Sequence, residues 1–184
     1  MKHYCIIGAG ASGLPVVKAF AENGIAFDCF EALADVGGIW NPESPHAVYG
    51  STYLNSSEKL TRYIDLWFPE GLPYYLSCQQ AEDYLRSYAR EFELYDKISF
   101  NKKVKSAKRV DGHWEIEIEG EKKPRLYDGL VIANGHHWHA KMPTDPGKFD
   151  GEILHSHDVK SKDQLKGKRV LVVGAGNSAV DILS

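Results

Sequence analysis

The chain has 184 residues, which is enough for one domain with a hydrophobic core and short for two. Apolar residues make up 43% and charged residues 26%, as in ordinary globular proteins, and the net charge of -3 argues against a nucleic-acid partner. We expect a cytoplasmic protein without a membrane segment, because no secretory signal opens the sequence and no apolar run approaches the ~20 residues that span a bilayer.

The first elements in chain order form a β-α-β unit. Tyr4 to Ile7 has the pattern of a short buried strand, and the loop Gly8-Ala-Gly-Ala-Ser-Gly13 follows it. A helical pattern then runs to about Glu22 and ends at Asn23-Gly24. A second strand, Ile25 to Phe30, is closed by Glu31.

The glycine loop has the spacing of a dinucleotide-binding fingerprint in the right context, with a strand before it and a helix after it. Its glycines allow a tight turn, close backbone approach to a diphosphate, and close packing of helix on strand, while the helix start favours anions. Glu31 follows Gly13 by 18 positions, near the ~20 expected for an acid that binds ribose hydroxyls. A carboxylate there would repel a 2′-phosphate by on the order of 4 kcal/mol, so this site should take FAD or NAD and not NADP. The expected contacts are Gly8, Gly10, Ala11, Ser12, Gly13 and Glu31.

Residues 32–79 lack a clear period and are rich in Gly, Pro, Ser, Tyr and Trp, which indicates a functional loop because so many aromatics argue against disorder. Within it, Asp35-Val-Gly-Gly-Ile-Trp40 places two glycines beside a large flat side chain. This favours a flavin, with contacts from Gly38, Ile39 and Trp40; the alternative is a turn with a core tryptophan.

The middle of the chain predicts a helix and then a β-meander. Gln80 to Leu94 is helical, and Val104 to Val110 pairs through Asp111-Gly112 with His113 to Glu119. Tyr127 closes a third strand, and Leu130 to Ala133 is a short buried strand that ends at Asn134-Gly135. The basic run Lys102 to Arg109 is interpreted as a solvated strand face.

The last part predicts the opening of a second unit of the same kind. After a connector over 136–150, Lys168 to Val173 is expected to be a strand that runs into Gly174-Ala-Gly-Asn-Ser-Ala179 and a helix. The chain stops at Ser184, about two turns into that helix, so we expect a fragment, a truncated reading frame or a trimmed form. The expected fold is α/β, with a Rossmann-like FAD-binding domain over 1–150 and the start of a second dinucleotide-binding domain over 151–184, which the resemblance described next implies to be an NADPH-binding domain.

These motifs together resemble the flavin-containing monooxygenase family over essentially all of the chain. The resemblance is carried by the two glycine loops, Glu31, the 35–40 element, Leu54-Asn-Ser-Ser57 and Leu130-Val-Ile-Ala-Asn-Gly-His-His137. Phe149-Asp-Gly-Glu-Ile-Leu-His155 matches the identifying motif of the family. Val159 stands where that motif has Tyr or Phe, and Trp stands in Baeyer–Villiger relatives, so this position supports neither subclass.

The resemblance implies that FAD and NADPH are the cofactors, and that O₂ and an amine or sulfide are the substrates. NADPH would reduce FAD, a peroxide adduct at flavin carbon 4a would form, and one oxygen atom would pass to nitrogen or sulfur. Asn55 is implied to lie beside the flavin as the catalytic residue, or else to be a turn or cap residue. Further FAD contacts are implied at Val104, Ala133, Asn134 and Gly135. The NADPH diphosphate would lie on Gly174, Gly176, Asn177, Ser178 and Ala179, whereas the groups that read its 2′-phosphate would lie beyond Ser184.

Other functions stay open at this point. A Baeyer–Villiger monooxygenase needs an arginine near the flavin, and residues 39–61 contain no Arg and no Asp. A flavin disulfide reductase needs paired cysteines, and Cys5, Cys29 and Cys78 form no C-x-x-C pair. This pattern also predicts no zinc site, and Cys5 and Cys29 are expected in the core as reduced thiols. A flavin-binding fragment without turnover is the non-enzymatic alternative.

Several side chains keep two interpretations. The histidines at 136, 137 and 139 are interpreted as connector residues and not as a metal site, and His155 as structural rather than an acid or base. Three aromatic residues could line a pocket or belong to the core: Trp67, Phe68 and Trp138. Oligomeric state cannot be predicted from these patterns, and a homodimer is compatible with them.

Overall fold

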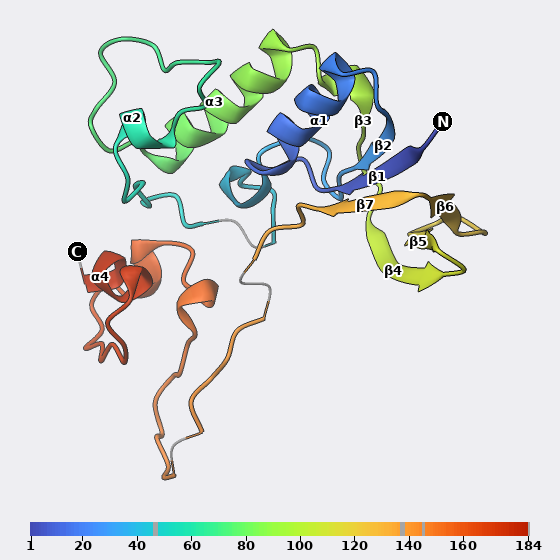
Figure 1. Ribbon diagram of the computed structural model, residues 1–184. Coiled ribbons are helices and arrows are strands. Elements are labelled where there is room, and N and C mark those ends of the chain that lie inside the picture. The colour runs from blue at the N-terminus through green and yellow to red at the C-terminus, as the bar shows by residue number, and fades with distance from the viewer. Residues whose placement is uncertain (46–47, 137–138, 145, 184) are drawn as a thin grey trace.

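The computed structural model describes residues 1–45, 48–136, 139–144 and 146–183. It contains a four-stranded parallel sheet, a three-stranded antiparallel sheet, and a C-terminal part that extends away from both (Figure 1). Helices α1 and α3 lie over one face of the parallel sheet, and the antiparallel sheet lies on the other side (Figure 1). The α/β class predicted from the sequence is confirmed.

The parallel sheet has the strand order β3-β2-β1-β7. Its strands are β1 (His3–Ile7), β2 (Ala26–Phe30), β3 (Ile98–Ser99) and β7 (Gly129–Ile132). Cys5 and Ile6 in the central strand β1 are fully buried. A short continuous apolar run is typical of a parallel strand covered on both faces, which explains why the sequence predicted β1 correctly.

Helix α1 (Gly13–Glu22) packs on the sheet through Gly13, Leu14 and Val17, and Asn23 ends it as predicted. Helix α3 (Cys78–Glu91) begins two residues before the predicted Gln80, because Ser77 and Gln80 form a capping box. It also ends before the predicted Leu94. Glu93 has a left-handed φ of 53°, and the Leu94 amide closes the helix end by donating to the Ala89 carbonyl at 2.8 Å.

The antiparallel sheet is the predicted meander of β4 (Val104–Val110), β5 (His113–Ile118) and β6 (Arg125–Tyr127). The hairpin turn has φ values of 47° at Asp111 and 84° at Gly112, as a two-residue turn of this type requires. Ile116 and Ile118 face the core, whereas Lys108 pairs with Glu115 on the wet face. The basic run is therefore a solvated strand face, as interpreted from the sequence.

The segment 32–79 is mostly irregular, with two short helices that the sequence did not predict. These are η1 (Gly38–Trp40) and α2 (Glu58–Thr61), and a third short helix, η2 (Tyr95–Lys97), follows α3. An antiparallel bridge between Tyr53 and Ser77 ties the end of this segment back to its middle.

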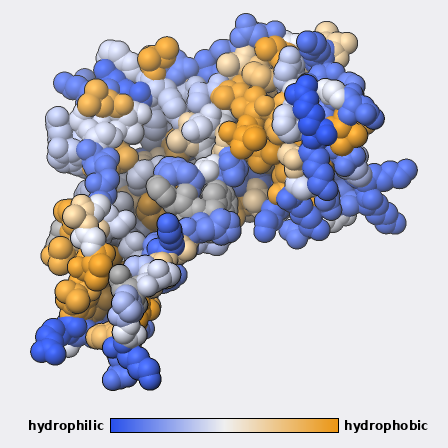
Figure 2. All heavy atoms as spheres, turned by 60° about the horizontal axis from the view of Figure 1, so that its bottom comes forward, coloured by the Kyte–Doolittle hydropathy of each residue, from blue (hydrophilic) through white to orange (hydrophobic). Residues whose placement is uncertain are grey.

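The C-terminal part contains η3 (Ser156–Asp158), η4 (Lys162–Gln164) and α4 (Asn177–Leu183). The predicted strand Lys168–Val173 is wrong: the segment pairs with no other strand in the described part of the chain. A strand needs a hydrogen-bonded neighbour, and without one the side chains of Leu171 and Val173 stay 86% and 79% exposed. Figure 2 shows apolar surface over this part of the molecule. Among the described helices, none is both long and apolar enough to cross a membrane.

Candidate functional site

Two positions of the loop between β1 and α1 accept only glycine. Gly8 has a φ of 98°, and a Cβ atom on it would lie 2.5 Å from the Ala133 carbonyl oxygen. A Cβ atom on Gly13 would lie 1.9 Å from the Gly8 carbonyl oxygen. The start of α1 therefore lies directly against the end of β1, which is the close packing that the fingerprint requires.

This loop leaves backbone donors available at the start of a helix. The amides of Gly13 and Leu14 both donate to the Gly10 carbonyl, at 3.1 Å. Within the described residues, no acceptor takes the amides of Gly10, Ala11 or Ser12. Three unpaired N–H groups at the positive end of a helix dipole fit an anion such as a diphosphate.

Glu31 holds this loop in place. Its side chain is buried, and its two carboxylate oxygens accept hydrogen bonds from the amides of Ala9 at 2.7 Å and Leu33 at 2.9 Å. The sequence assigned Glu31 to ribose hydroxyls and did not anticipate these two amides. Because each carboxylate oxygen has a second lone pair, Glu31 can brace the loop and still accept a ribose hydroxyl.

The 35–40 element touches the glycine loop backbone to backbone. The Gly37 amide donates to the Ala9 carbonyl at 3.2 Å. A Cβ atom on Gly38 would lie 3.1 Å from the Cα atom of Gly10, so side chains at these two positions would separate the segments. The two glycine motifs that the sequence singled out separately thus form one surface, with Ile39 and Trp40 half-buried beside it.

The end of β7 completes this surface. The Ala133 amide donates to the Ile7 carbonyl at 2.9 Å, and the Cα atom of Asn134 would lie 3.3 Å from a Cβ atom on Gly8. Gly135 follows with a φ of 80°. The carboxyl ends of β1, β2 and β7 therefore meet, and ligands bind at this edge of an open α/β sheet.

The segment that leads into Val104 is hydrogen-bonded to the end of β2 at the same edge. The Lys102 amide donates to the Glu31 carbonyl at 2.8 Å, two positions before Val104 begins β4. The segments that carry the first predicted set thus lie together in the structure: Gly8, Gly10, Ala11, Ser12, Gly13, Glu31, Gly38, Ile39, Trp40, Val104, Ala133, Asn134 and Gly135.

Sequence reasoning missed two groups of residues at this site. The Tyr63 hydroxyl donates to the Ala11 carbonyl in the glycine loop, and its ring packs on Tyr84 and Tyr88 of α3. Arg86 and Tyr95 both bind Asp35, which precedes the paired glycines. The aromatic richness of 32–79 was a signal for Tyr63 without identifying its partner, and nothing in the sequence pattern pointed to Arg86 or Tyr95.

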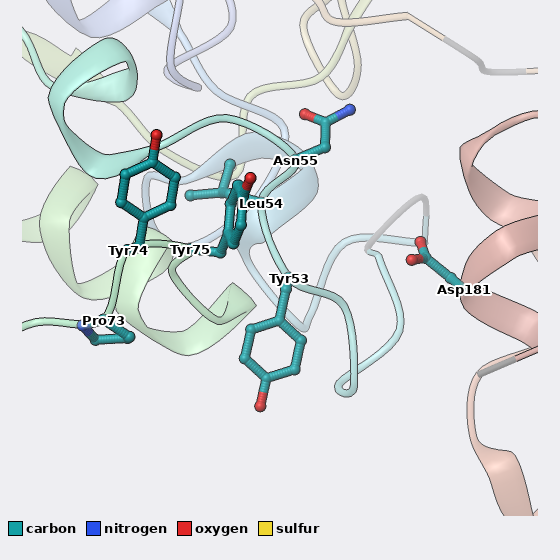
Figure 3. Close-up of a pocket in the computed structure, with 7 residues that line it drawn as sticks. All are labelled: Tyr53, Leu54, Asn55, Pro73, Tyr74, Tyr75 and Asp181. Atoms are coloured by element: carbon teal, nitrogen blue, oxygen red, sulfur yellow. The ribbon is translucent and has the colours of Figure 1, made fainter.

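Asn55 belongs to a different feature of the surface. It lines an open cavity of about 640 Å³ together with Tyr53, Leu54, Pro73, Tyr74, Tyr75 and Asp181. Figure 3 shows the aromatic side chains on one side and Asp181 of α4 on the other. Within the described part of the chain, no hydrogen bond joins Asn55 to residues 8–13.

The second glycine loop leads into α4. Gly174 has a φ of 127°, and the amides of Ala179 and Val180 donate to the Gly176 carbonyl at 3.0 and 3.2 Å. Asn177 and Ser178 form the first turn of α4. Among the described residues, nothing lies within 4 Å of a Cβ atom placed on Gly174 or Gly176. The Tyr49 hydroxyl reaches α4, donating to Asp181 at 2.9 Å, and burial together with this bond raises the pKa of Tyr49 to about 12.

The remaining candidate residues have structural surroundings. Burial raises the pKa values of the Cys5 and Cys29 thiols to about 12, as expected for core cysteines. The imidazole of His155 accepts from the His157 amide at 3.1 Å and caps η3, which agrees with the structural interpretation.

Of the aromatic residues interpreted either as pocket lining or as core, Trp67 lies at the surface and Phe68 packs against the core. Trp67 is 66% exposed under the Arg62 guanidinium, and Phe68 packs on Tyr84 with ring centroids 3.9 Å apart. His137 and Trp138 lie outside the described residues. The described residues contain no group of three or more His, Cys, Asp or Glu side chains that could hold a metal ion.

A family model, sequence relatives and solved structures similar to this chain all point to flavin monooxygenases. A family model described as flavin-binding monooxygenase-like matches residues 1–184. Flavin-containing monooxygenase 5 of Oryctolagus cuniculus is 39% identical over 197 residues, covering 98% of this chain and 37% of that relative. The structure of S-allyl-L-cysteine S-oxygenase from Allium sativum has a TM-score of 0.88 at 25% identity, covering 98% of this chain and 47% of that one. OTEMO in complex with FAD and NADP has a TM-score of 0.74 at 26% identity, covering 99% and 36%. The chain thus spans little more than a third of the mammalian relative.

Proposed function

Because this chain belongs to the flavin-binding monooxygenase-like family, we propose that residues 1–150 form the first part of an FAD-binding domain and that 151–184 open an NADPH-binding domain. The observation that carries this proposal is the single surface built by the glycine loop, the 35–40 element and the end of β7.

On this proposal the FAD diphosphate is bound by the amides of Gly10, Ala11 and Ser12, and the ribose by Glu31. Gly38 lets the cofactor approach the backbone, and Trp40 closes the site against the core. Bound flavin supplies electron transfer and the activation of O₂, while the protein orients it and excludes water. The second glycine loop would hold the NADPH diphosphate, which is supported by the OTEMO complex with FAD and NADP.

We further propose that the whole protein transfers one oxygen atom from O₂ to a nitrogen or sulfur atom, while NADPH supplies two electrons and the second oxygen atom leaves as water. The names of the relatives, among them an S-oxygenase, support this chemistry. Asn55 would contribute a neutral amide that can hydrogen-bond the reacting groups without donating a strongly acidic proton.

A Baeyer–Villiger reaction is the second candidate, because OTEMO and cyclohexanone monooxygenase are among the structural neighbours. That reaction needs an arginine beside the flavin, and the first arginine after the 39–61 segment is Arg62. Its guanidinium lies 4.2 Å from the centre of the Trp67 ring and 4.0 Å from Glu58. Arg62 is thus engaged by Trp67 and Glu58, and its position lends the Baeyer–Villiger alternative no support.

The test is to supply the FAD-loaded protein with NADPH and O₂ and to offer a tertiary amine, a sulfide or a cyclic ketone. We expect NADPH oxidation coupled to formation of the N-oxide or S-oxide, and no lactone. Lactone as the main product would favour the Baeyer–Villiger alternative, and hydrogen peroxide as the only product with every substrate would contradict both.

A further inference from the structure

We propose that Arg86 and Tyr95 are positioning residues for FAD: by fixing Asp35, they hold the backbone of residues 36–38 against the first glycine loop. This inference rests on the proposed FAD site. It concerns residues of α3 and η2 that carry no fingerprint motif.

Asp35 is fully engaged by groups from three places in the chain. Its Oδ1 atom accepts hydrogen bonds from the Val36 amide at 2.7 Å and from the Tyr95 hydroxyl at 2.9 Å. Its Oδ2 atom accepts from Nε of Arg86 at 2.8 Å. The Tyr95 hydroxyl is protonated at neutral pH and can donate, and burial together with the bond to Asp35 raises its pKa further, to about 12.

Arg86 is itself fixed from the other side. Its guanidinium forms an ion pair of 2.9 Å with Glu82, whose side chain is 3% exposed. The side-chain amide of Gln79 donates to the second oxygen of Glu82 at 3.0 Å. A planar guanidinium between two carboxylates has little conformational freedom, so Arg86 fixes the position of Asp35 relative to α3.

The segment that follows Asp35 needs an anchor of this kind. Gly37 and Gly38 have φ values of 121° and 59°, and two consecutive glycines have a large conformational entropy to lose when they are ordered. Just before them, Val36 is completely buried. Gly38, three residues after Asp35, lies so close to Gly10 that a methyl group on it would be 3.1 Å from the Gly10 Cα atom, a tight contact. A shift of Asp35 therefore displaces the surface that faces the cofactor.

A purely structural role makes a different prediction. The side chains of Arg86 and Asp35 are both 28% exposed, and ion pairs between partly exposed groups contribute modestly to global stability, although removal of Arg86 also leaves the buried Glu82 carboxylate without its cation. If the network acts mainly on the loop, its loss should weaken FAD binding more than it lowers the unfolding temperature of the apoprotein. If it only supports α3, the unfolding temperature should fall and the FAD affinity should stay.

The test compares Arg86→Gln with Arg90→Gln, an exposed arginine one turn further along the same helix. FAD affinity is measured by titrating the apoprotein and following flavin fluorescence, and the melting temperature of the apoprotein is measured separately. We expect Arg86→Gln and Asp35→Asn each to weaken FAD binding about tenfold, the effect of losing one net charge-assisted hydrogen bond. Arg90→Gln should bind FAD as the wild type does. Arg86→Lys should fall between the wild type and Arg86→Gln, because lysine keeps the charge but loses the planar fork.

The double variant decides whether the two residues act as one unit. Arg86→Gln combined with Asp35→Asn should bind FAD no worse than about tenfold below the wild type, because the same contact is lost only once. A loss of about a hundredfold in the double variant, or unchanged affinity in Arg86→Gln, would overturn the inference while leaving the proposed FAD site intact. Wild-type protein that binds no FAD would overturn both.

Discussion

Replacement of Gly13 by alanine tests the packing of α1 on β1, on which the site depends. The new Cβ atom would lie 1.9 Å from the Gly8 carbonyl oxygen and 2.9 Å from the Gly8 carbonyl carbon, both backbone atoms that cannot swing aside. The loop would have to withdraw by about 1 Å or more. Overpacking of a tight interior costs about 1–3 kcal/mol, and a backbone collision belongs at the upper end.

A loss of about 3 kcal/mol should lower the melting temperature of a domain this size by roughly 6–12 °C. It should also abolish high-affinity FAD binding, because the withdrawn loop no longer presents the amides of Gly10 to Ser12. Circular dichroism melting of the apoprotein and a flavin titration measure the two effects. Gly50→Ala is the matched control, because nothing lies within 4 Å of a Cβ atom there. Wild-type stability and FAD affinity in Gly13→Ala would refute this reasoning.

Three further perturbations follow from the same contacts. Glu31→Gln keeps the size of the side chain but replaces one of two accepting oxygens with an NH₂ group. FAD affinity, measured by fluorescence titration, should therefore fall by about 10- to 100-fold, and an unchanged affinity would contradict the role of Glu31. Tyr63→Phe keeps the ring and loses only the hydroxyl bond to Ala11, so we expect a loss of about 1 kcal/mol in urea unfolding and a smaller effect than Tyr63→Ala. In the folded state the thiols of Cys5 and Cys29 have pKa values of about 12, whereas in the unfolded chain their pKa has the ordinary value of 9.0. Because only the unfolded chain then releases these protons, the free energy of unfolding should fall as pH rises from 9 to 10. That fall should be smaller in Cys29→Ala, and an identical slope would show that the thiols are not its cause.

Local patterns predicted most of the fold. The β-α-β unit, the Asp111-Gly112 hairpin and the meander each depend on residues close in sequence, whose spacing records strand, helix or turn directly. The two-residue strand β3 was missed because it is held by pairing with β2 and has no period of its own. Lys168–Val173 shows the reverse case. Its apolar composition predicted a strand, but composition does not supply the neighbouring strand that a sheet requires.

The site was predicted unevenly for a related reason. Residues fixed by backbone geometry, such as Gly8 and Gly13, leave a motif because no other residue fits. Residues that act through side-chain contacts across the fold leave none: Arg86 reaches Asp35 from 51 positions away and Tyr95 from 60. Such partners become visible only when α3 is placed over the sheet.

The most direct measurement of the proposed FAD site is amide hydrogen exchange with and without FAD. Added FAD should slow exchange at residues 10–12, whose N–H groups have no acceptor among the described residues, and leave the solvated hairpin at 108–115 unchanged. Slowed exchange only elsewhere, or no slowing at saturating FAD in a folded protein, would contradict the proposal that these amides hold the cofactor diphosphate.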